Sequence, residues 1–356
     1  MSLSGIEALE EYAGFFAPQI PRAPEGRFAS IVLLRETKSY AIFTTEGGEQ
    51  QDTERTRAGL RRSEPADRLV MFKRKQVAPE RRTGKALMRQ YGVFPHAFVR
   101  KGGELMDVIY GAEAVDEAQR TKTVSKDDVV ADCYLTEGLC THCPDCLIYG
   151  YAAVEGEGSR KSRVLTDSCF SVRPYPLIQK GIKFNVIDEQ EQTSGTITEF
   201  DHTMPEIFLP AIVTTVDLTL DEFVYVISNI LHTTRYGKEA SRQGFVRNHI
   251  MAIAFSDVEL FANLELTQAF YDAFVDEGMD LATHPLSRQD FERHLPAVIE
   301  QLSSGIAGRL HWVTGERLAQ ILDEVRGLGR DGERFAAFLK GLNTRSSEFA
   351  LGKGAE

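Results

Sequence analysis

Four of the five cysteines in this chain of 356 residues lie within a stretch of fourteen. Three of them are separated by two residues each, a spacing that lets consecutive thiolates surround one metal ion. A tetrahedral site needs a fourth ligand, which must come from outside this run. The metal ligands that we expect are Cys133, Cys140, Cys143 and Cys146.

The fourth ligand is the least constrained of the set. Cys133 is the first candidate because the loop that follows it contains Gly138 and can fold back onto the run. His142 lies between two ligands and would reach the same ion only from a cramped position, so it is the second candidate, and Cys169 is the third. A site with all four positions filled by cysteine has no open position for a substrate, so it would hold a loop in place and perform no chemistry.

The kind of centre follows from the surroundings of the cysteines. Nothing at the N-terminus resembles a signal peptide, so we expect reduced thiols and not disulfides. The spacing favours structural zinc. An iron–sulfur cluster is the alternative, although Leu147 stands where bacterial ferredoxin runs have proline. Unligated cysteines are the third interpretation.

The charge of the chain is unevenly distributed. The formal net charge is −11, yet residues 54–101 carry 14 Lys and Arg against four acidic residues. Such a block is either a solvated loop or the electrostatic footprint of a site for a polyanion. No apolar run approaches the roughly 18 residues of a membrane span, so we expect a cytoplasmic protein with no membrane partner.

Hydrophobic patterns predict a chain of the α+β class. Residues 27–35 read as a buried strand, whereas residues 46–80 show no periodicity and are expected to form a mobile basic loop. Alternation over 184–210 predicts a protruding hairpin. Thr219-Leu-Asp-Glu222 is a capping box that begins a helix, and residues 258–342 are expected to form a helical subdomain.

A second unusual segment runs from His232 to His249, where cations and rings alternate around two glycines. No Walker loop, Rossmann fingerprint or nucleophile elbow occurs in the sequence. Cations neutralise phosphates while rings stack on unpaired bases, so this composition predicts contact with single-stranded RNA. The alternative is a surface loop with satisfied ion pairs.

Several of these motifs, in this order and at these intervals, also carry a family resemblance. The motifs are Cys140-x2-Cys-x2-Cys146 followed by Leu-Ile-Tyr-Gly, Lys161-Ser-Arg163-Val, Arg235-Tyr-Gly and Arg247-Asn-His249. With them the chain resembles the backbone subunit of type I-D CRISPR effector (Cascade) complexes, a member of the Cas-seven branch of the RAMP superfamily. The resemblance covers nearly the whole chain.

The resemblance implies one elaborated domain over residues 1–356, with an RRM-like, ferredoxin-type core. Long insertions would form fingers, a zinc knuckle at 133–150 and a thumb hairpin at 184–210. It further implies a subunit for antiviral defence that binds guide RNA and oligomerises along it as a filament. Such a subunit contacts the other subunits of the complex and presents the guide for pairing with target DNA or RNA.

The resemblance also implies a single groove for the guide. Lys161 and Arg163 would lie on the palm against guide phosphates, the segment from Arg235 would line the same groove, and Phe200 or Met204 would interrupt base stacking. The candidate RNA-binding residues are Arg160, Lys161, Arg163, Arg235, Tyr236, Lys238, Arg242, Arg247, Asn248, His249, Phe200, Met204 and Lys85.

Two other functions compete with this non-catalytic scaffold. Related subunits of type III complexes cut the bound target strand with an aspartate on a flexible loop. Asp52, in a polar segment after the first strands, is the one candidate for that role, and Mg²⁺ would be the metal. The other competitor is an iron–sulfur or redox protein unrelated to CRISPR.

Overall fold

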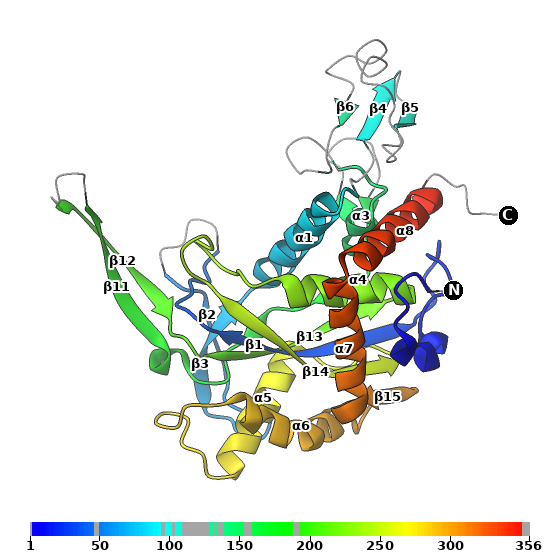
Figure 1. Ribbon diagram of the computed structural model, residues 1–356. Coiled ribbons are helices and arrows are strands. Elements are labelled where there is room, and N and C mark those ends of the chain that lie inside the picture. The colour runs from blue at the N-terminus through cyan, green and yellow to red at the C-terminus, as the bar shows by residue number, and fades with distance from the viewer. Residues whose placement is uncertain are drawn as a thin grey trace.

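A five-stranded antiparallel sheet organises the computed structural model of the chain (Figure 1). In spatial order its strands are β15 (Leu310–Val313), β14 (Val246–Ser256), β1 (Phe28–Thr37), β13 (Phe208–Val216) and β9 (Val164–Thr166). The structure describes residues 2–45, 50–93, 97–101, 104–108, 129–130, 133, 139–152, 159–187 and 193–350; within 97–130 and 182–200 it describes the backbone alone.

The three central strands are apolar on both faces because both faces are covered. Ile31 and Leu33 of β1 point into one hydrophobic core, while Val32 and Leu34 point into the other. Strands that are buried on both sides read as continuous apolar runs, which explains the strand predicted at 27–35. A bulge in the pairing of β1 with β14 lies between Val32 and Leu33.

Four strands of the sheet and two of the helices that pack on it follow one another along the chain in the order strand, helix, strand, strand, helix, strand. These elements are β1, α1 (Lys73–Gln90), β9, β13, α4 (Leu220–His232) and β14. Since β13 is antiparallel to both of its neighbours, β1 and β9 run parallel on either side of it. The four strands stand in the spatial order 4-1-3-2, so β13 is inserted between the two strands that α1 connects.

Helices cover the sheet on both sides (Figure 1). On one face α1 and α4 pack with α7 (Gly315–Arg330) and α8 (Gly332–Ala350), and on the other lie α5 (Asn263–Asp276) and α6 (Arg288–Ser303). The predicted α+β class and its helical C-terminal region are confirmed. Because both faces of β1 are occupied, neither face of this strand is open to a ligand.

The remaining elements surround this core. A long ribbon of β11 (Gln179–Ile187) and β12 (Thr193–Thr203) projects from the sheet where the hairpin was expected (Figure 1). Among the described residues no helix is long and apolar enough to span a membrane. The other elements are η1 (Glu7–Phe15), β2 (Thr53–Arg57), β3 (Pro65–Met71), β4 (Ala97–Lys101), β5 (Glu104–Val108), β6 (Val129–Val130), α3 (Pro144–Tyr149), β7 (Tyr151–Ala152), β8 (Ser159–Arg160), β10 (Cys169–Phe170) and η3 (Tyr175–Leu177).

The mobile loop predicted over 46–80 is wrong for most of its length. The segment contains β2, β3 and the first turns of α1. Strand β2 is largely exposed, so it lacks the alternation that marks a half-buried strand. Helix α1 has seven Lys or Arg among its 18 residues and holds Pro79 in its interior, and both features disguise its first half in the sequence.

Candidate metal centre and nucleic-acid interface

The four predicted cysteines come together in one buried cluster, with all their sulfurs within 4.8 Å of one another. Cys146 Sγ lies 3.4 Å from Cys133 Sγ and 3.9 Å from Cys140 Sγ. A tetrahedral ion with bonds of about 2.3 Å to sulfur would separate its ligands by about 3.8 Å. The donor set and its spacing therefore suit a single metal ion such as zinc.

Local backbone geometry fixes this cluster. The backbone N–H of Cys140 points at Cys133 Sγ (3.4 Å), and that of Cys143 points at Cys140 Sγ (3.3 Å). Helix α3 begins directly after Cys143 with Pro144, whose missing N–H costs nothing in the first turn. Backbone N–H groups aimed at sulfur stabilise thiolates, which are the form that binds metal.

The structure selects Cys133 as the fourth member and leaves the two alternatives outside. The imidazole Nδ1 of His142 contacts the carbonyl oxygen of Cys140 and lies 3.0 Å from Thr141 Oγ1. Cys169 lies in β10, where burial raises the pKa of its thiol to about 12.

Two cationic side chains of α1 lie beside the cluster. Lys85 Nζ lies 3.0 Å from the Cys133 carbonyl, 3.4 Å from Cys133 Sγ and 3.4 Å from an Asp145 carboxylate oxygen. Arg81 holds the fully buried Asp145 with bonds of 2.7 and 3.1 Å. Burial lowers the pKa of Lys85, but the nearby Asp145 and thiols outweigh burial and raise this pKa above its ordinary value. Lys85, expected on RNA, therefore faces the cysteines instead.

The other predicted RNA-binding residues divide between the two ends of β1 and do not line one groove. Phe28 pairs with Val216, next to the strand that follows Lys161, whereas Thr37 pairs with Val246, next to Arg247. The ten residues of β1 span about 30 Å. We call these the knuckle end, near Phe28 and the cysteines, and the hairpin end, near Thr37 and the ribbon of β11 and β12.

At the hairpin end the segment 235–247 folds against residues 38–43. Lys38 N–H donates to the Phe245 carbonyl (2.7 Å), and Gly244 N–H donates to the Tyr40 carbonyl (2.7 Å). The contact is a backbone ladder that holds the basic segment in an extended turn on the surface. Arg235, Arg242 and Arg247 of this segment are exposed, and Lys238 is half-buried.

The two glycines of this segment are explained by close packing. Gly237 and Gly244 have φ of 89° and 74°. A Cβ at Gly237 would lie 2.5 Å from the Ile42 carbonyl oxygen, and one at Gly244 would lie 2.0 Å from that of Tyr236. Only glycine fits both positions.

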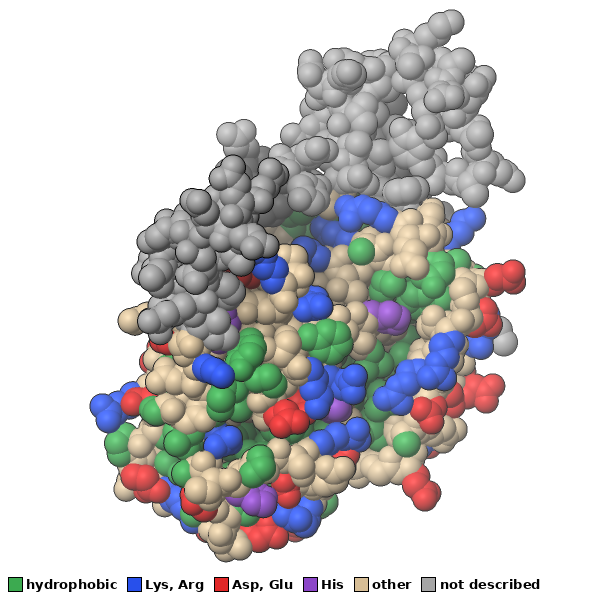
Figure 2. All heavy atoms as spheres, turned by 60° about the vertical axis from the view of Figure 1, so that its left-hand side comes forward, with side chains coloured by type: hydrophobic (Ala, Val, Ile, Leu, Met, Phe, Trp, Pro, Cys, Tyr) green, Lys and Arg blue, Asp and Glu red, His purple; other side chains and the backbone are tan. Residues whose placement is uncertain are grey.

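Cations and rings share the surface that results. Arg235 stacks over Phe245 at 5.4 Å, and Lys180 of the ribbon lies over Tyr40 at 5.9 Å. In Figure 2, which brings the hairpin side forward, Lys and Arg side chains are spread over the upper and central parts of the coloured surface, and most Asp and Glu side chains lie nearer its edges. The residues of this hairpin-end surface are Lys38, Tyr40, Lys180, Arg235, Lys238, Arg242, Phe245 and Arg247.

Three residues predicted to contact RNA here are engaged inside the protein. The hydroxyl of Tyr236, which is fully buried, contacts Arg35, Asn248 and Glu80 at 3.2, 2.8 and 3.1 Å. Asn248 also accepts from Arg35 at 2.8 Å. His249 pairs with Glu36 at 2.9 Å, and burial lowers the pKa of its imidazole. Tyr236 cannot stack on a base from this position.

At the knuckle end the predicted cations differ in exposure. Arg163 is 8% exposed and pairs with Glu222, and it also donates to the Asp217 carbonyl at 2.9 Å. The expectation that it grips a guide phosphate is therefore wrong, because its charge is already neutralised. Lys161 is exposed, and Arg160 is half-buried with its guanidinium 5.0 Å from the centre of the Phe349 ring.

The remaining predicted residues have other settings. Met204 packs against the core at the base of the ribbon, and its backbone bonds to Ile178 and Thr37, so it does not protrude as a wedge. Phe200 lies in β12, at a position where the structure describes the backbone alone.

Asp52 lies beside residues 43–45. Its carboxylate accepts from Thr45 Oγ1 at 3.2 Å, its other oxygen is buried without a hydrogen bond, and burial raises its pKa. The cysteine cluster is the one grouping of metal-ligating side chains found in the described ranges, and Asp52 is not in it.

Sequence reasoning missed Tyr40 and Lys180, which lie in different strands and meet only in the fold. It also missed the exposed cations of α1, Lys73, Arg74 and Arg82. The excess of Lys and Arg over residues 54–101 was the available signal for the cations of α1, but it did not indicate where in the fold they would lie.

Comparison with known proteins assigns the family. The model of the family described as Csc2 Crispr matches residues 15–339. The crystal structure of Thermofilum pendens Csc2 is similar over 100% of both chains, with a TM-score of 0.58 and 16% identity. A chain of a CRISPR RNA-guided surveillance complex, pre-nicking, covers 84% of this chain and 99% of its own length, with a TM-score of 0.48 and 11% identity. No curated protein matches the sequence. The likeness to Thermofilum pendens Csc2 is one of fold, and the family match over nearly the whole sequence places the chain in the Csc2 family of CRISPR proteins.

Proposed function

We propose that the chain is a guide-RNA-binding backbone subunit of a CRISPR effector complex of type I-D, working in the cytoplasm. The observation that carries this proposal is the Csc2 family match over residues 15–339. In this role copies of the chain follow one another along the guide, contact other subunits, and present the guide bases to a target strand. Sequence specificity then comes from base pairing, while the protein binds the sugar-phosphate backbone of the guide.

The core of this subunit is RRM-like. The βαββαβ order and the 4-1-3-2 arrangement of β14, β1, β13 and β9 support that assignment. An isolated RRM binds bases on the open face of its sheet, yet here α5 and α6 cover that face. The guide must therefore run elsewhere.

The guide path that we propose follows the hairpin-end surface and the exposed side of α1. Glu80 of α1 meets Arg35 at 2.9 Å near the hairpin end, and this buried pair ties the helix to the sheet. Exposed Lys73, Arg74 and Arg82 extend the cations of the hairpin-end surface along the helix. Cations with interleaved rings suit an unpaired strand. The ribbon of β11 and β12 is then the thumb, with Phe200 as the candidate wedge.

The cysteine cluster serves as a closed structural zinc site in this proposal. Four sulfurs within 4.8 Å of one another suit one ion better than a multi-iron cluster, whose own volume separates its cysteines. With all positions filled by cysteine, the ion does no chemistry. It instead joins the loop at Cys133 to α3, next to α1.

Binding of a labelled single-stranded RNA tests the proposed path. The variant Arg242→Ala/Arg247→Ala removes two exposed cations of the hairpin-end surface, and Arg309→Ala/Arg317→Ala removes the same charge from exposed ion pairs with Asp257 and Glu11. We expect the first to weaken binding roughly tenfold and the second to change it less than about twofold. Equal effects of the two variants would reject this surface as the guide path.

The nuclease alternative has Asp52 alone to support it. Assembled complex incubated with complementary target and Mg²⁺ tests it directly. Regularly spaced products that disappear in Asp52→Ala would establish cleavage by this subunit, and uncut target would leave the scaffold role.

A further inference from the structure

A pocket of about 370 Å³ opens beside the cysteine run at the knuckle end. Its walls come from four separate parts of the chain: the N-terminal segment, the cysteine run, β7 with β8, and the end of α8. The side chains that matter for its chemistry are Arg22, Tyr151, Arg160 and Phe349. We call this the knuckle pocket.

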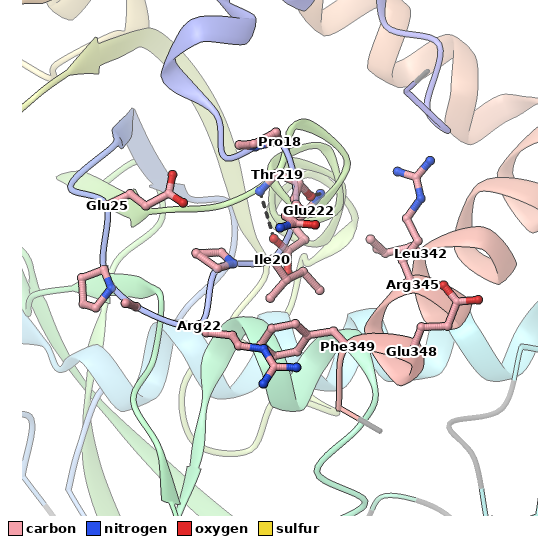
Figure 3. Close-up of a pocket in the computed structure, with 14 residues that line it drawn as sticks. Pro18, Ile20, Arg22, Glu25, Thr219, Glu222, Leu342, Arg345, Glu348 and Phe349 are labelled. Carbon is pink, nitrogen blue, oxygen red and sulfur yellow. Dashed lines mark hydrogen bonds between the residues drawn. The ribbon is translucent and has the colours of Figure 1, made fainter. Parts of the chain in front are cut away.

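The knuckle pocket continues into a larger cleft of about 750 Å³, which is drawn in Figure 3. Arg22 and Phe349 line both, so they stand where one hollow meets the other. Three prolines stiffen the other wall of the cleft, Pro18, Pro21 and Pro24.

The knuckle pocket combines positive charge with aromatic surface. Arg160 is held in place because its Nε donates to the Leu147 carbonyl at 3.2 Å and its guanidinium stacks on Phe349 at 5.0 Å. Arg22 is exposed at the junction, and Lys161 follows Arg160 on the surface. Among the described residues that line the knuckle pocket none is acidic, whereas Glu25, Glu222 and Glu348 line the larger cleft.

We propose that the knuckle pocket binds one nucleotide of a single-stranded nucleic acid. Guanidinium groups recognise phosphate through paired hydrogen bonds, and both Arg22 and Arg160 line the pocket. The rings of Tyr151 and Phe349 provide a stacking surface for the base, which any base can use. A volume of about 370 Å³ falls within the range of small-ligand pockets.

This site is distinct from the hairpin-end surface. The knuckle pocket lies toward Phe28, whereas the hairpin-end surface lies beyond Thr37, and β1 alone spans about 30 Å. The α1 part of the guide path comes closer to the pocket, because Arg81 donates to the Gly150 carbonyl at 3.2 Å, next to Tyr151. The pocket therefore takes a second strand, or a second stretch of one strand, in addition to the guide contact. The inference concerns a different surface and does not require the guide path to be correct.

Photochemical crosslinking of the full chain tests the site. The probe is a DNA oligonucleotide of about ten nucleotides that carries 5-iodouracil, because short single strands fill sites of this class. We expect crosslinks on Tyr151 or Phe349, mapped by mass spectrometry, and competition by unlabelled DNA. The variant Arg22→Ala/Arg160→Ala should reduce them at least about tenfold.

Three controls make the result decisive. Phe349→Leu keeps an apolar side chain, so it should lower crosslinking to Tyr151 without changing thermal stability by more than a degree or two. Arg309→Ala/Arg317→Ala should change nothing. Arg242→Ala/Arg247→Ala, which tests the guide path, should leave the Tyr151 and Phe349 crosslinks intact.

Several outcomes would overturn the inference. Crosslinks that map outside the pocket, or that persist in Arg22→Ala/Arg160→Ala, would mean that no strand enters it. Loss of the Tyr151 and Phe349 crosslinks in Arg242→Ala/Arg247→Ala would mean that the pocket is not a separate site. Competition by an acidic peptide but not by DNA would reassign the pocket to a protein partner.

Discussion

The hairpin end and the knuckle end of β1 use positive charge in different ways. At the hairpin end Arg242 and Arg247 are exposed, and the segment that carries them is fixed by backbone hydrogen bonds. At the knuckle end Arg163 and Lys85 are turned inward, against a buried carboxylate or the thiols. Arg242 and Arg247 are accessible to an anion from outside, whereas Arg163 and Lys85 neutralise anions of the protein itself.

Two residues of the same tripeptide show what decides between these uses. Lys161 and Arg163 are two positions apart, so they point to the same side of an extended backbone in principle. In the fold Lys161 is exposed, while Arg163 meets Glu222, which α4 brings from far along the chain. The location of the acidic partner, and not the local motif, determines whether a cation is available to a ligand.

The largest difference between the two ends should appear when the metal ligands are removed. We expect Cys143→Ser to lose the bound metal and to cost about 4 kcal/mol of stability, because a buried site with one ligand missing no longer binds zinc tightly. Metal content and thermal unfolding measure this. Cys169→Ala, which removes the thiol outside the cluster, is the matched control and should keep its metal. Full metal content in Cys143→Ser would contradict the assignment of the ligands.

The second prediction concerns the buried pair at the knuckle end. Arg163→Ala leaves the Glu222 carboxylate, which is fully buried, without its cation, so we expect a loss of about 3–5 kcal/mol. The neighbouring change Lys161→Ala removes an exposed charge and should stay within about 0.5 kcal/mol of the parent. Urea unfolding compares the two variants. A similar cost for both would show that Arg163 is not a structural cation.

The parts of the molecule that the sequence predicted well are those whose determinants are local. The metal ligands all lie within fourteen residues, so their spacing alone indicated a cluster. Thr219 and Glu222 form the capping box that their spacing predicts, with bonds of 3.2 and 2.9 Å. Alternation between polar and apolar residues indicated the ribbon of β11 and β12, which needs only its own turn to form.

The prediction of a single groove for the guide failed because such a groove depends on contacts between distant segments of the chain. The order of motifs along a chain does not tell which end of a strand each motif reaches, and the register of β1 with β13 and β14 separates them. Tyr236 looked like a stacking ring, yet Arg35 and Glu80 draw its hydroxyl into the core. The short helix that the sequence predicts over residues 83–91 is the second half of α1, and the first half was missed because its charge masks a periodicity that only packing reveals.

The third prediction compares the ends by the salt dependence of RNA binding. Each phosphate contact on a single strand contributes about 0.7 to the slope of log K against log salt concentration. We therefore expect Arg242→Ala/Arg247→Ala to lower the slope by about 1.4, with stability within about 0.5 kcal/mol of the parent. Binding titrations at several salt concentrations measure the slope. An unchanged slope with weaker binding would mean that these residues act without touching phosphate.

The smallest effect is expected at Asp52, which lies near the hairpin end. Burial raises the pKa of this carboxyl above its unfolded value, although Thr45 and Lys75 oppose the shift. A raised pKa favours the folded state below the unfolded pKa, and this contribution is lost as pH rises through the folded pKa. At pH 7 the ionised group is thus slightly unfavourable, and we expect Asp52→Asn to raise stability by about 0.5 kcal/mol. The gain should vanish near pH 3, where the parent carboxyl is protonated in both states. Thermal unfolding at the two pH values measures the difference, and a destabilised Asp52→Asn at pH 7 would show instead that the ionised carboxylate makes a contact that stabilises the fold.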